Sequence, residues 1–200
     1  GRAVSLPAGA IGGIKAAAAT TGAYSMVRQQ FGIPIGRMEG VEDKIARIAA
    51  IAYMTEGARV YACSAIDKGE QPPVVSAVLK AYTTELSRDV ASDSMDVFAG
   101  AGVIQGPNNI IGTGYSSAPV GITVEGANIL SRNLMIFGQG AIRCHPFVLR
   151  EMELVHEPDR EAAVVKFDDL LMQHIGFAVS NTASTLLLGL SFGLMGRVPG

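Results

Sequence analysis

Apolar residues recur every three to four positions along most of this chain, a spacing that places them on one face of a helix. Glycine follows the first two of these runs, at Gly32 and Gly69, where a helix can end. The pattern predicts four helices, over Ala8–Phe31, Glu42–Lys68, Pro72–Phe98 and Asn128–Cys144, the last broken by Gly138 and Gly140. No alternation of apolar and polar residues is long enough to predict a strand. The predicted fold class is therefore all-α, with the long helices forming an up-down bundle.

A glycine-rich stretch, Ala99–Pro119, separates the third and fourth predicted helices. It contains neither a phosphate-binding loop motif nor a strand followed by a dinucleotide-binding turn. We interpret it as a long loop, and a loop of this length in a compact domain is usually functional or disordered.

The C-terminal part is patterned differently, so we divide the chain into a helical bundle at residues 1–145 and an incomplete helical extension at residues 146–200. A short amphipathic helix, Phe147–Val155, precedes a charged linker, Glu157–Arg160, and a second amphipathic segment, Glu161–Met172. Ile175–Gly196 then carries no charge over a length that could cross a bilayer, yet it is diluted by small and polar residues. Two interpretations stay open: a helix buried in the protein, or one attached to a membrane.

Composition narrows the class of protein. Hydrophobic residues make up 48% of the 200 positions and the net charge is −2, so the chain can bury a core and has no basic surface for nucleic acid. Cys63 and Cys144 form no CxxC pair, which favours reduced thiols in the cytoplasm. The histidines have no ligand spacing among themselves or with the cysteines, so we expect no metal site. Because the sequence starts within a pattern, we expect a fragment of a longer protein.

Glu125 is the candidate for chemistry. Its neighbours Val124 and Ile129 are apolar, so the sequence predicts a partly desolvated carboxylate, and desolvation strengthens a carboxylate as a base. Gly126 leaves the adjoining backbone uncovered, so a substrate could approach an N–H there. The alternative is an acid at a helix start, bound to the amides of the first turn.

Three motifs carry a resemblance to a known family. They are Val124–Ile129 (VEGANI), Arg28–Gly36 (RQQFGIPIG) and Phe98–Gly102 (FAGAG). Together, in their order along the chain and at this spacing, they resemble the C-terminal helical domain of acyl-CoA dehydrogenases over roughly residues 1–145. The remainder is similar to the added C-terminal segment of the bacterial long-chain branch.

The resemblance implies an α,β-dehydrogenation of fatty acyl-CoA, the first step of fatty acid β-oxidation. Glu125 would remove the α-proton of the thioester, and a backbone N–H near Glu125, assigned to Gly126, would hold the thioester carbonyl. FAD would accept the hydride and pass electrons to an external acceptor such as an electron-transfer flavoprotein.

The resemblance also implies cofactor and substrate contacts. Arg28 would bind the flavin pyrophosphate across a subunit interface, which implies a homo-oligomer, and Phe31 would pack near the same cofactor. Gly100 belongs to the glycine-rich turn that reaches a neighbouring subunit's cofactor. Asp96 stands where the family usually has a glutamine that contacts the adenosine end. Arg2 lies near the family's CoA-binding arginine.

The chain also departs from the family pattern. The threonine and glutamine that usually follow the Glu-Gly pair are Ala127 and Ile129, and an Arg-Asp pair upstream of the base is replaced near Tyr115 and Ser116. Two alternatives therefore stay open: a helical interaction or membrane-anchoring module without chemistry, with possible peripheral membrane contact, or an acyl-CoA oxidase that reacts with oxygen.

Overall fold

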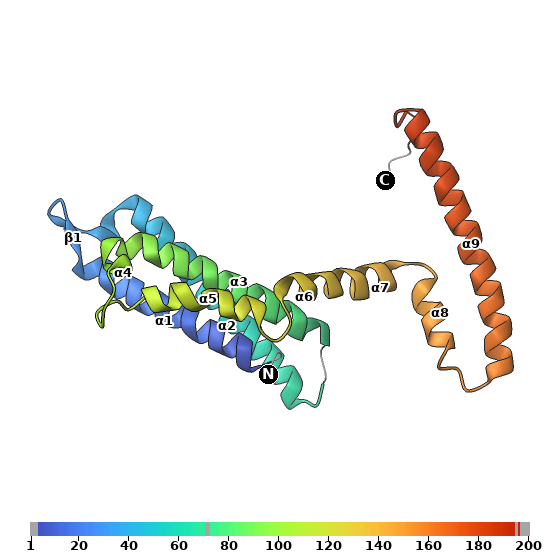
Figure 1. The fold of residues 1–200 in the computed structure, drawn as a ribbon, viewed down its shortest axis with the longest axis horizontal. Helices are drawn as coiled ribbons and strands as arrows, with labels where there is room; N and C mark the ends of the chain where they lie inside the picture. The colour runs from blue at the N-terminus through green and yellow to red at the C-terminus, as the bar shows by residue number, and fades with distance from the viewer. Residues whose placement is uncertain (1–3, 71–72, 195, 197–200) are drawn as a thin grey trace. The chain divides into compact units, whose positions relative to one another are not determined.

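The computed structural model describes residues 4–70, 73–194 and 196. It divides into two compact units, Gly1–Ile136 (unit 1) and Phe137–Gly200 (unit 2), which are described separately. Within the described residues the chain is almost entirely helical, which confirms the predicted all-α class (Figure 1).

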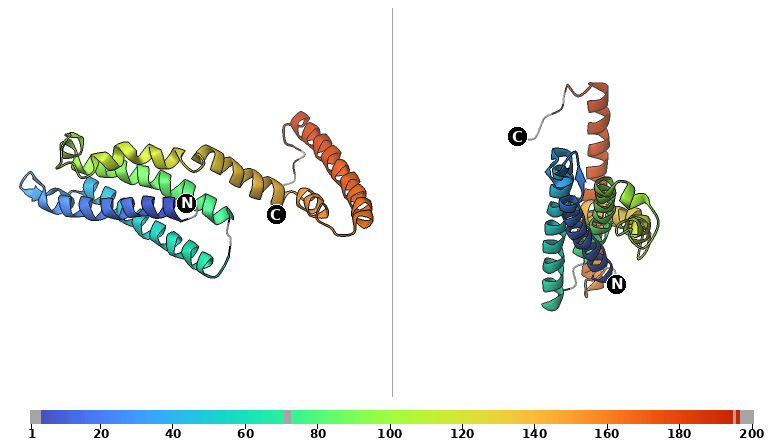
Figure 2. Two further views of the ribbon diagram at one scale, coloured as in Figure 1. Left: turned by 60° about the horizontal axis from the view of Figure 1, so that its bottom comes forward. Right: turned by 90° about the vertical axis from the view of Figure 1, so that its left-hand side faces the viewer.

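Unit 1 is built on three long helices: α1 (Ser5–Val27), α2 (Glu39–Asp67) and α3 (Pro73–Phe98). They lie side by side in both orientations of Figure 2, and each packs on the other two. Their facing sides bury a core made of Ile14, Ala17, Ile48, Ile51, Val90, Phe98 and Ile111.

The first predicted helix is too long at its C-terminal end, because α1 stops at Val27 and a small hairpin follows. The strands β1 (Gln29–Gln30) and β2 (Ile33–Pro34) pair antiparallel. The two residues between them, Phe31 and Gly32, have φ angles of 53° and 79°. Two successive left-handed residues make the tight turn that suits a two-residue hairpin. A short 3₁₀ helix, η1 (Ile35–Arg37), then leads into α2.

The predicted loop Ala99–Pro119 is also wrong in part, because it contains α4 (Gly100–Val103) and most of α5 (Gly112–Thr123). Asn109 organises this region. Its side-chain amide donates to the carbonyls of Gly102 (2.7 Å) and Ile104 (3.0 Å), and its oxygen accepts from the N–H of Gly112 (2.6 Å) at the start of α5. This single side chain therefore satisfies backbone groups that the glycine-rich sequence leaves open.

The last helix of unit 1 is α6 (Asn128–Met135), which packs on α3. It is followed by the π-helical segment η2 (Ile136–Ala141), at the glycines predicted to break the fourth helix. Wider π turns of this kind commonly interrupt α-helices.

Unit 2 contains α7 (Ile142–Cys144), α8 (Val148–Leu154) and the long α9 (Arg160–Leu190). The predicted linker does lie between α8 and α9, except for Arg160, the first residue of α9. The two segments predicted after it are wrong as separate pieces, since α9 runs from the first into the second without a break. Asp159 begins α9 by accepting a hydrogen bond from the Ala162 N–H (3.1 Å).

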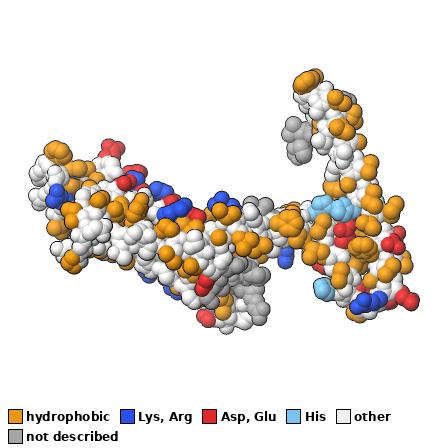
Figure 3. Space-filling view, in the orientation of Figure 1, with side chains coloured by type: hydrophobic (Ala, Val, Ile, Leu, Met, Phe, Trp, Pro, Cys, Tyr) orange, Lys and Arg blue, Asp and Glu red, His pale blue; other side chains and the backbone are white. Residues whose placement is uncertain are grey.

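The second half of α9 is not the buried helix that one interpretation of the sequence foresaw. Leu170 is the buried residue of α9 among those described, and the apolar side chains from Ile175 onward are exposed, as the hydrophobic surface of this helix in Figure 3 shows. None of the described helices is both long enough and apolar enough to cross a bilayer.

Gly36 tests how tightly unit 1 is packed. A Cβ atom at Gly36 would lie 2.9 Å from the hydroxyl oxygen and 3.1 Å from the backbone carbonyl oxygen of Ser25, which is buried in α1. Because a backbone oxygen cannot rotate away, Gly36→Ala is expected to lower the free energy of unfolding by about 1–3 kcal/mol. Urea unfolding followed by tyrosine fluorescence measures this, since all 5 tyrosines lie in unit 1.

The matched control is Gly57→Ala in the exposed interior of α2, where an added Cβ meets nothing within 4 Å. It is expected to raise the free energy of unfolding by about 0.5–1 kcal/mol, because alanine favours a helix over glycine. Equal effects of the two substitutions would contradict the close approach at Gly36.

Candidate functional site

A buried lysine holds the segment that carries Glu125. Lys80 lies on α3 with 0% of its surface exposed. Its ammonium donates to the Ile122 carbonyl (3.1 Å), the Gly126 carbonyl (2.7 Å) and the Asn128 Oδ1 atom (2.6 Å). An ammonium has three N–H donors, so these acceptors use all of them. The end of α5, the turn after it and the first residue of α6 are thereby tied to one point on α3.

Asn128 extends this network to the next turns of α3. It is buried, and its side-chain amide donates to the Ala81 carbonyl (3.1 Å), the Thr84 hydroxyl (2.9 Å) and the Glu85 carboxylate (3.1 Å). Gly121, one turn before the end of α5, comes so near to α3 that an added Cβ would lie 3.3 Å from the Thr84 methyl group. The backbone on both sides of Glu125 is therefore fixed against α3.

Sequence analysis missed this network and did not single out Lys80. The signal that could have found it is the run of positions Ala77, Lys80, Ala81 and Thr84, which are buried and follow helical spacing. A lysine on a stripe of small residues has room to lie along the helix and to place its charge at a carbonyl-rich turn.

Glu125 occupies the turn that Lys80 holds. Its φ angle is 53° and that of Gly126 is 91°. A left-handed conformation is uncommon for a residue with a side chain, and non-glycine examples gather at functional sites. The carboxylate has no hydrogen-bond or ion-pair partner among the described residues. The alternative that it binds the first-turn amides of α6 is therefore not what the structure shows.

The expected burial of Glu125 is wrong for the chain by itself. Glu125 is exposed, and so are the apolar residues around it: Val124 is 40%, Ile129 78% and Leu130 53% exposed. Residues before and after the turn are drawn toward Lys80, which leaves the Glu125 side chain on the outer side. The carboxylate and its apolar neighbours in the sequence are therefore all uncovered.

A second group of the sequence-predicted residues lies together at the other end of α3. Arg28 and Gly100 both line a cavity of about 530 Å³, whose wall includes Tyr24 and Phe98. The two rings stack with centroids 4.2 Å apart. Arg28 has no side-chain partner among the described residues, and an added Cβ at Gly100 would meet nothing within 4 Å. The cavity thus offers an unpaired cation and open backbone.

The remaining candidates lie outside both groups. Phe31 is 93% exposed at the tip of the hairpin and does not line the cavity. Asp96 is exposed and forms an ion pair with Lys44 (3.1 Å). Arg2 lies outside the described residues.

Lys44 also pairs with the buried Asp93 (2.7 Å), which Arg47 contacts from the other side (2.8 Å). Two hydrogen bonds raise the pKa of the Lys44 ammonium: the bond to Asp93 has the larger effect and the bond to Asp96 the smaller. The acids near the end of α3, which oppose its helix dipole, are thus explained by cations of α2 that face them.

In unit 2, two histidines that are distant in the sequence meet. The rings of His145 and His174 have centroids 4.7 Å apart, and His174 contacts Glu151 (2.7 Å). Phe147 and Phe177 complete an aromatic cluster around them. No group of three metal-ligating side chains comes together within the described ranges.

Lys80→Met is expected to lower the free energy of unfolding by about 3 kcal/mol or more, because methionine fills a similar volume but leaves buried acceptors without donors. Lys68→Met, at an exposed position after α2, is the control and is expected to change it by less than about 0.5 kcal/mol. Both are measured by urea unfolding with tyrosine fluorescence. A Lys80 variant as stable as the Lys68 variant would show that the ammonium does not hold the turn.

Comparison with known proteins agrees with the fold. Residues 2–136 match the model of the acyl-CoA dehydrogenase C-terminal domain, and residues 142–200 match that of the acyl-CoA dehydrogenase C-terminal segment of bacterial type.

Solved structures match part of the chain. An FAD complex of PigA is 22% identical with a TM-score of 0.64, covering 70% of this chain and 36% of that chain. An acyl-CoA dehydrogenase from Geobacillus kaustophilus is 18% identical with a TM-score of 0.64, covering 68% and 35%. A glutaryl-coenzyme A dehydrogenase in complex with glutaryl-CoA is 24% identical with a TM-score of 0.62, covering 69% and 35%.

The chain therefore spans about a third of the length of these structures, whose likeness shows the fold. The family models together cover the helical bundle and the helices after it. The chain belongs to the acyl-CoA dehydrogenase family, of which it carries the C-terminal helical part.

Proposed function

We propose that this chain supplies the catalytic base and part of the cofactor site of an FAD-dependent dehydrogenase that converts fatty acyl-CoA to trans-2-enoyl-CoA. The observation that carries the proposal is the turn at Glu125. A strained residue with a free carboxylate is held between two points that are anchored to a buried lysine. Such an arrangement keeps a base in place before a substrate arrives, which is where much of the benefit of positioning comes from.

The turn also supports a role for Gly126. Its carbonyl accepts from Lys80, while its own N–H, on the preceding peptide, donates to no described residue. An unbonded N–H beside the base can donate to an oxygen that gains negative charge. In the proposed reaction this oxygen is the thioester carbonyl, and Glu125 takes the proton from the adjacent carbon.

Because Glu125 is exposed in this chain, the proposed reaction needs further groups that shield the base from water. Proton removal from carbon beside a thioester is favoured when water is excluded from the base. Ile129 and Leu130 offer apolar area next to Glu125 that an acyl chain and further domains of the enzyme would cover. We infer that the base becomes desolvated only in that assembly.

The cavity beside Arg28 fits part of FAD. The unpaired guanidinium suits a pyrophosphate, since arginine pairs well with phosphate oxygens, and Gly100 lets the backbone come near to a ligand. When bound, FAD supplies the acceptance of hydride. Arg28 and Gly100 would hold and orient it, and Phe31 and Asp96 stay further candidates that lie outside this cavity.

The separation of the two groups supports a shared site in a homo-oligomer. Lys80 lies on α3 beside the Glu125 group, and Phe98 lies on α3 beside the Arg28 group. The two residues are 18 positions apart, which corresponds to about 27 Å along a helix. We propose that Arg28 serves the cofactor of a neighbouring subunit, while Glu125 serves the subunit's own substrate. Electrons would then pass to an external acceptor such as an electron-transfer flavoprotein.

One alternative function is motivated by the exposed apolar surface of α9: a helical interaction module without chemistry. This alternative predicts no acyl-CoA turnover by the full-length polypeptide. The other alternative, an acyl-CoA oxidase, predicts turnover that produces hydrogen peroxide instead of reducing an artificial dye.

In the full-length polypeptide that carries this chain, Glu125→Gln is expected to lower the rate of flavin reduction by acyl-CoA at least about 100-fold, because glutamine cannot take a proton. The flavin absorbance spectrum should be retained, since Glu125 is not among the proposed cofactor contacts. Stopped-flow absorbance under anaerobic conditions measures both quantities.

Glu39→Gln, at an exposed position in the first turn of α2, is the control and should reduce flavin at the normal rate. A Glu125→Gln variant that reacts as fast as this control, with its flavin bound, would remove Glu125 from the mechanism.

A further inference from the structure

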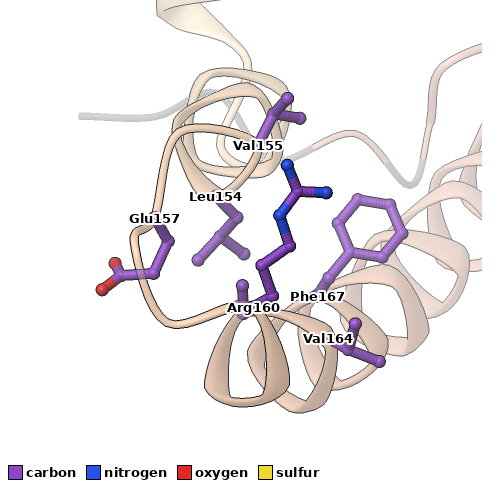
Figure 4. A pocket seen from close by; sticks show the side chains of 7 residues that line it. Leu154, Val155, Glu157, Arg160, Val164 and Phe167 are labelled. Atoms are coloured by element: carbon purple, nitrogen blue, oxygen red, sulfur yellow. The ribbon is translucent and has the colours of Figure 1, made fainter.

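A small cavity lies within unit 2, at the corner where α8 meets α9 (Figure 4). Its volume is about 260 Å³, and it is lined by Leu154, Val155, Glu157, Arg160, Ala163, Val164 and Phe167. Aliphatic and aromatic side chains make up most of this wall. The cavity belongs to neither group of residues that the proposed function uses.

Arg160 is the cation of this cavity. It is the first residue of α9 and has no hydrogen-bond or ion-pair partner among the described residues. Figure 4 shows its guanidinium extending between Val155 and Phe167, while the carboxylate of Glu157 points away on the other side. The carboxylate of Asp159 accepts from the Ala162 N–H, so it is turned to the helix start.

Arg160 lies at the positive end of the α9 dipole, where Asp159 and Glu161 are its acidic neighbours in the sequence. The N-terminus of a helix carries partial positive charge, so a cation in the first turn is disfavoured and an anion is attracted. A ligand of this cavity would therefore need two features: a negative group that pairs with the Arg160 guanidinium, and a short apolar part that packs against the apolar walls.

We propose that this corner binds a short aliphatic carboxylate, with the carboxylate on Arg160 and the chain against Leu154, Val164 and Phe167. Arginine and carboxylate match in a bidentate geometry. The cavity is somewhat smaller than the about 300–1,000 Å³ typical of pockets for drug-sized ligands, which limits the chain to a few carbons. A free acid fits better than a membrane lipid, because the tail of a lipid would remain in the bilayer.

The test titrates the 200-residue chain, labelled with ¹⁵N, with hexanoate, hexanol and hexylamine, which share one chain and differ in charge. Hexanoate is expected to shift the amide resonances of residues 154–167 saturably, hexanol more weakly, and hexylamine not at all. Equal shifts by all three probes, or shifts by hexanoate elsewhere only, would overturn the proposal. Vesicles of anionic phospholipid that shift these resonances when hexanoate does not would also overturn it, in favour of a lipid surface.

Variants then test each part of the site. Arg160→Gln should weaken hexanoate binding about three- to fivefold, the range of exposed ion pairs, and remove the preference over hexanol. Glu157→Gln should tighten it, because a nearby negative charge is lost. Ala163→Leu should abolish it by filling the cavity.

Arg150→Gln is the matched control, since Arg150 lines an adjoining cavity, and it should bind as the unchanged chain does. Equal binding by the Arg160 and Arg150 variants would contradict the assigned cation. If Arg160→Gln does not fold, unchanged affinity in Glu157→Gln would contradict it instead. Because none of these residues belongs to the proposed catalytic turn, loss of acyl-CoA turnover and loss of hexanoate binding are separate outcomes.

Discussion

The burial of the Lys80 ammonium is the constraint on which the rest of unit 1 depends. Taking a charge out of water is costly unless its hydrogen bonds are replaced, and here each N–H finds an oxygen. One of these oxygens, on Ile122, belongs to the last turn of α5, where carbonyls lack helical partners and the helix dipole is negative. The lysine therefore acts as a cap for one helix and an anchor for the next.

This anchor explains how a strained turn can persist. The left-handed backbone at Glu125 is unfavourable in isolation, but the carbonyl after it and the first residue of α6 cannot move without leaving Lys80 unsatisfied. The other motifs of the family share this feature, because Phe31 and Ala99 also have positive φ angles. In each case the motif marks a sharp change of chain direction next to a helix end. Family membership and local geometry therefore point to the same residues for independent reasons.

Helical periodicity predicted the all-α class and the three long helices, since burial of one face repeats along them. Apolar spacing could not place the buried face of α3, because the apolar Val78 and Tyr82 are exposed while Lys80 and Thr84 are buried. Which face of α3 is buried depends on α5, which packs on α3 and lies partly in the glycine-rich stretch. The side chain of Asn109 helps to organise this stretch. The motifs gave Arg28 and Gly100 to the cofactor, and the structure places both on the wall of one cavity, while their cofactor roles and the role of Glu125 as the base stay proposals. In the proposed enzyme the cover over Glu125 would come from other domains, so the pattern around Glu125 could not predict it.

The same constraint can be observed in one experiment, the ¹H–¹⁵N spectrum of the lysine side chains of this chain at neutral pH. An ammonium with three protein acceptors exchanges its protons slowly with water, so Lys80 is expected to give a visible NH₃⁺ signal with nuclear Overhauser contacts to Gly126 and Asn128. An exposed ammonium such as that of Lys68 exchanges too fast to be seen. If Lys80 also gives no signal, or a signal with contacts to neither residue, then the turn that carries Glu125 is not held as described, and the account of the site fails with it.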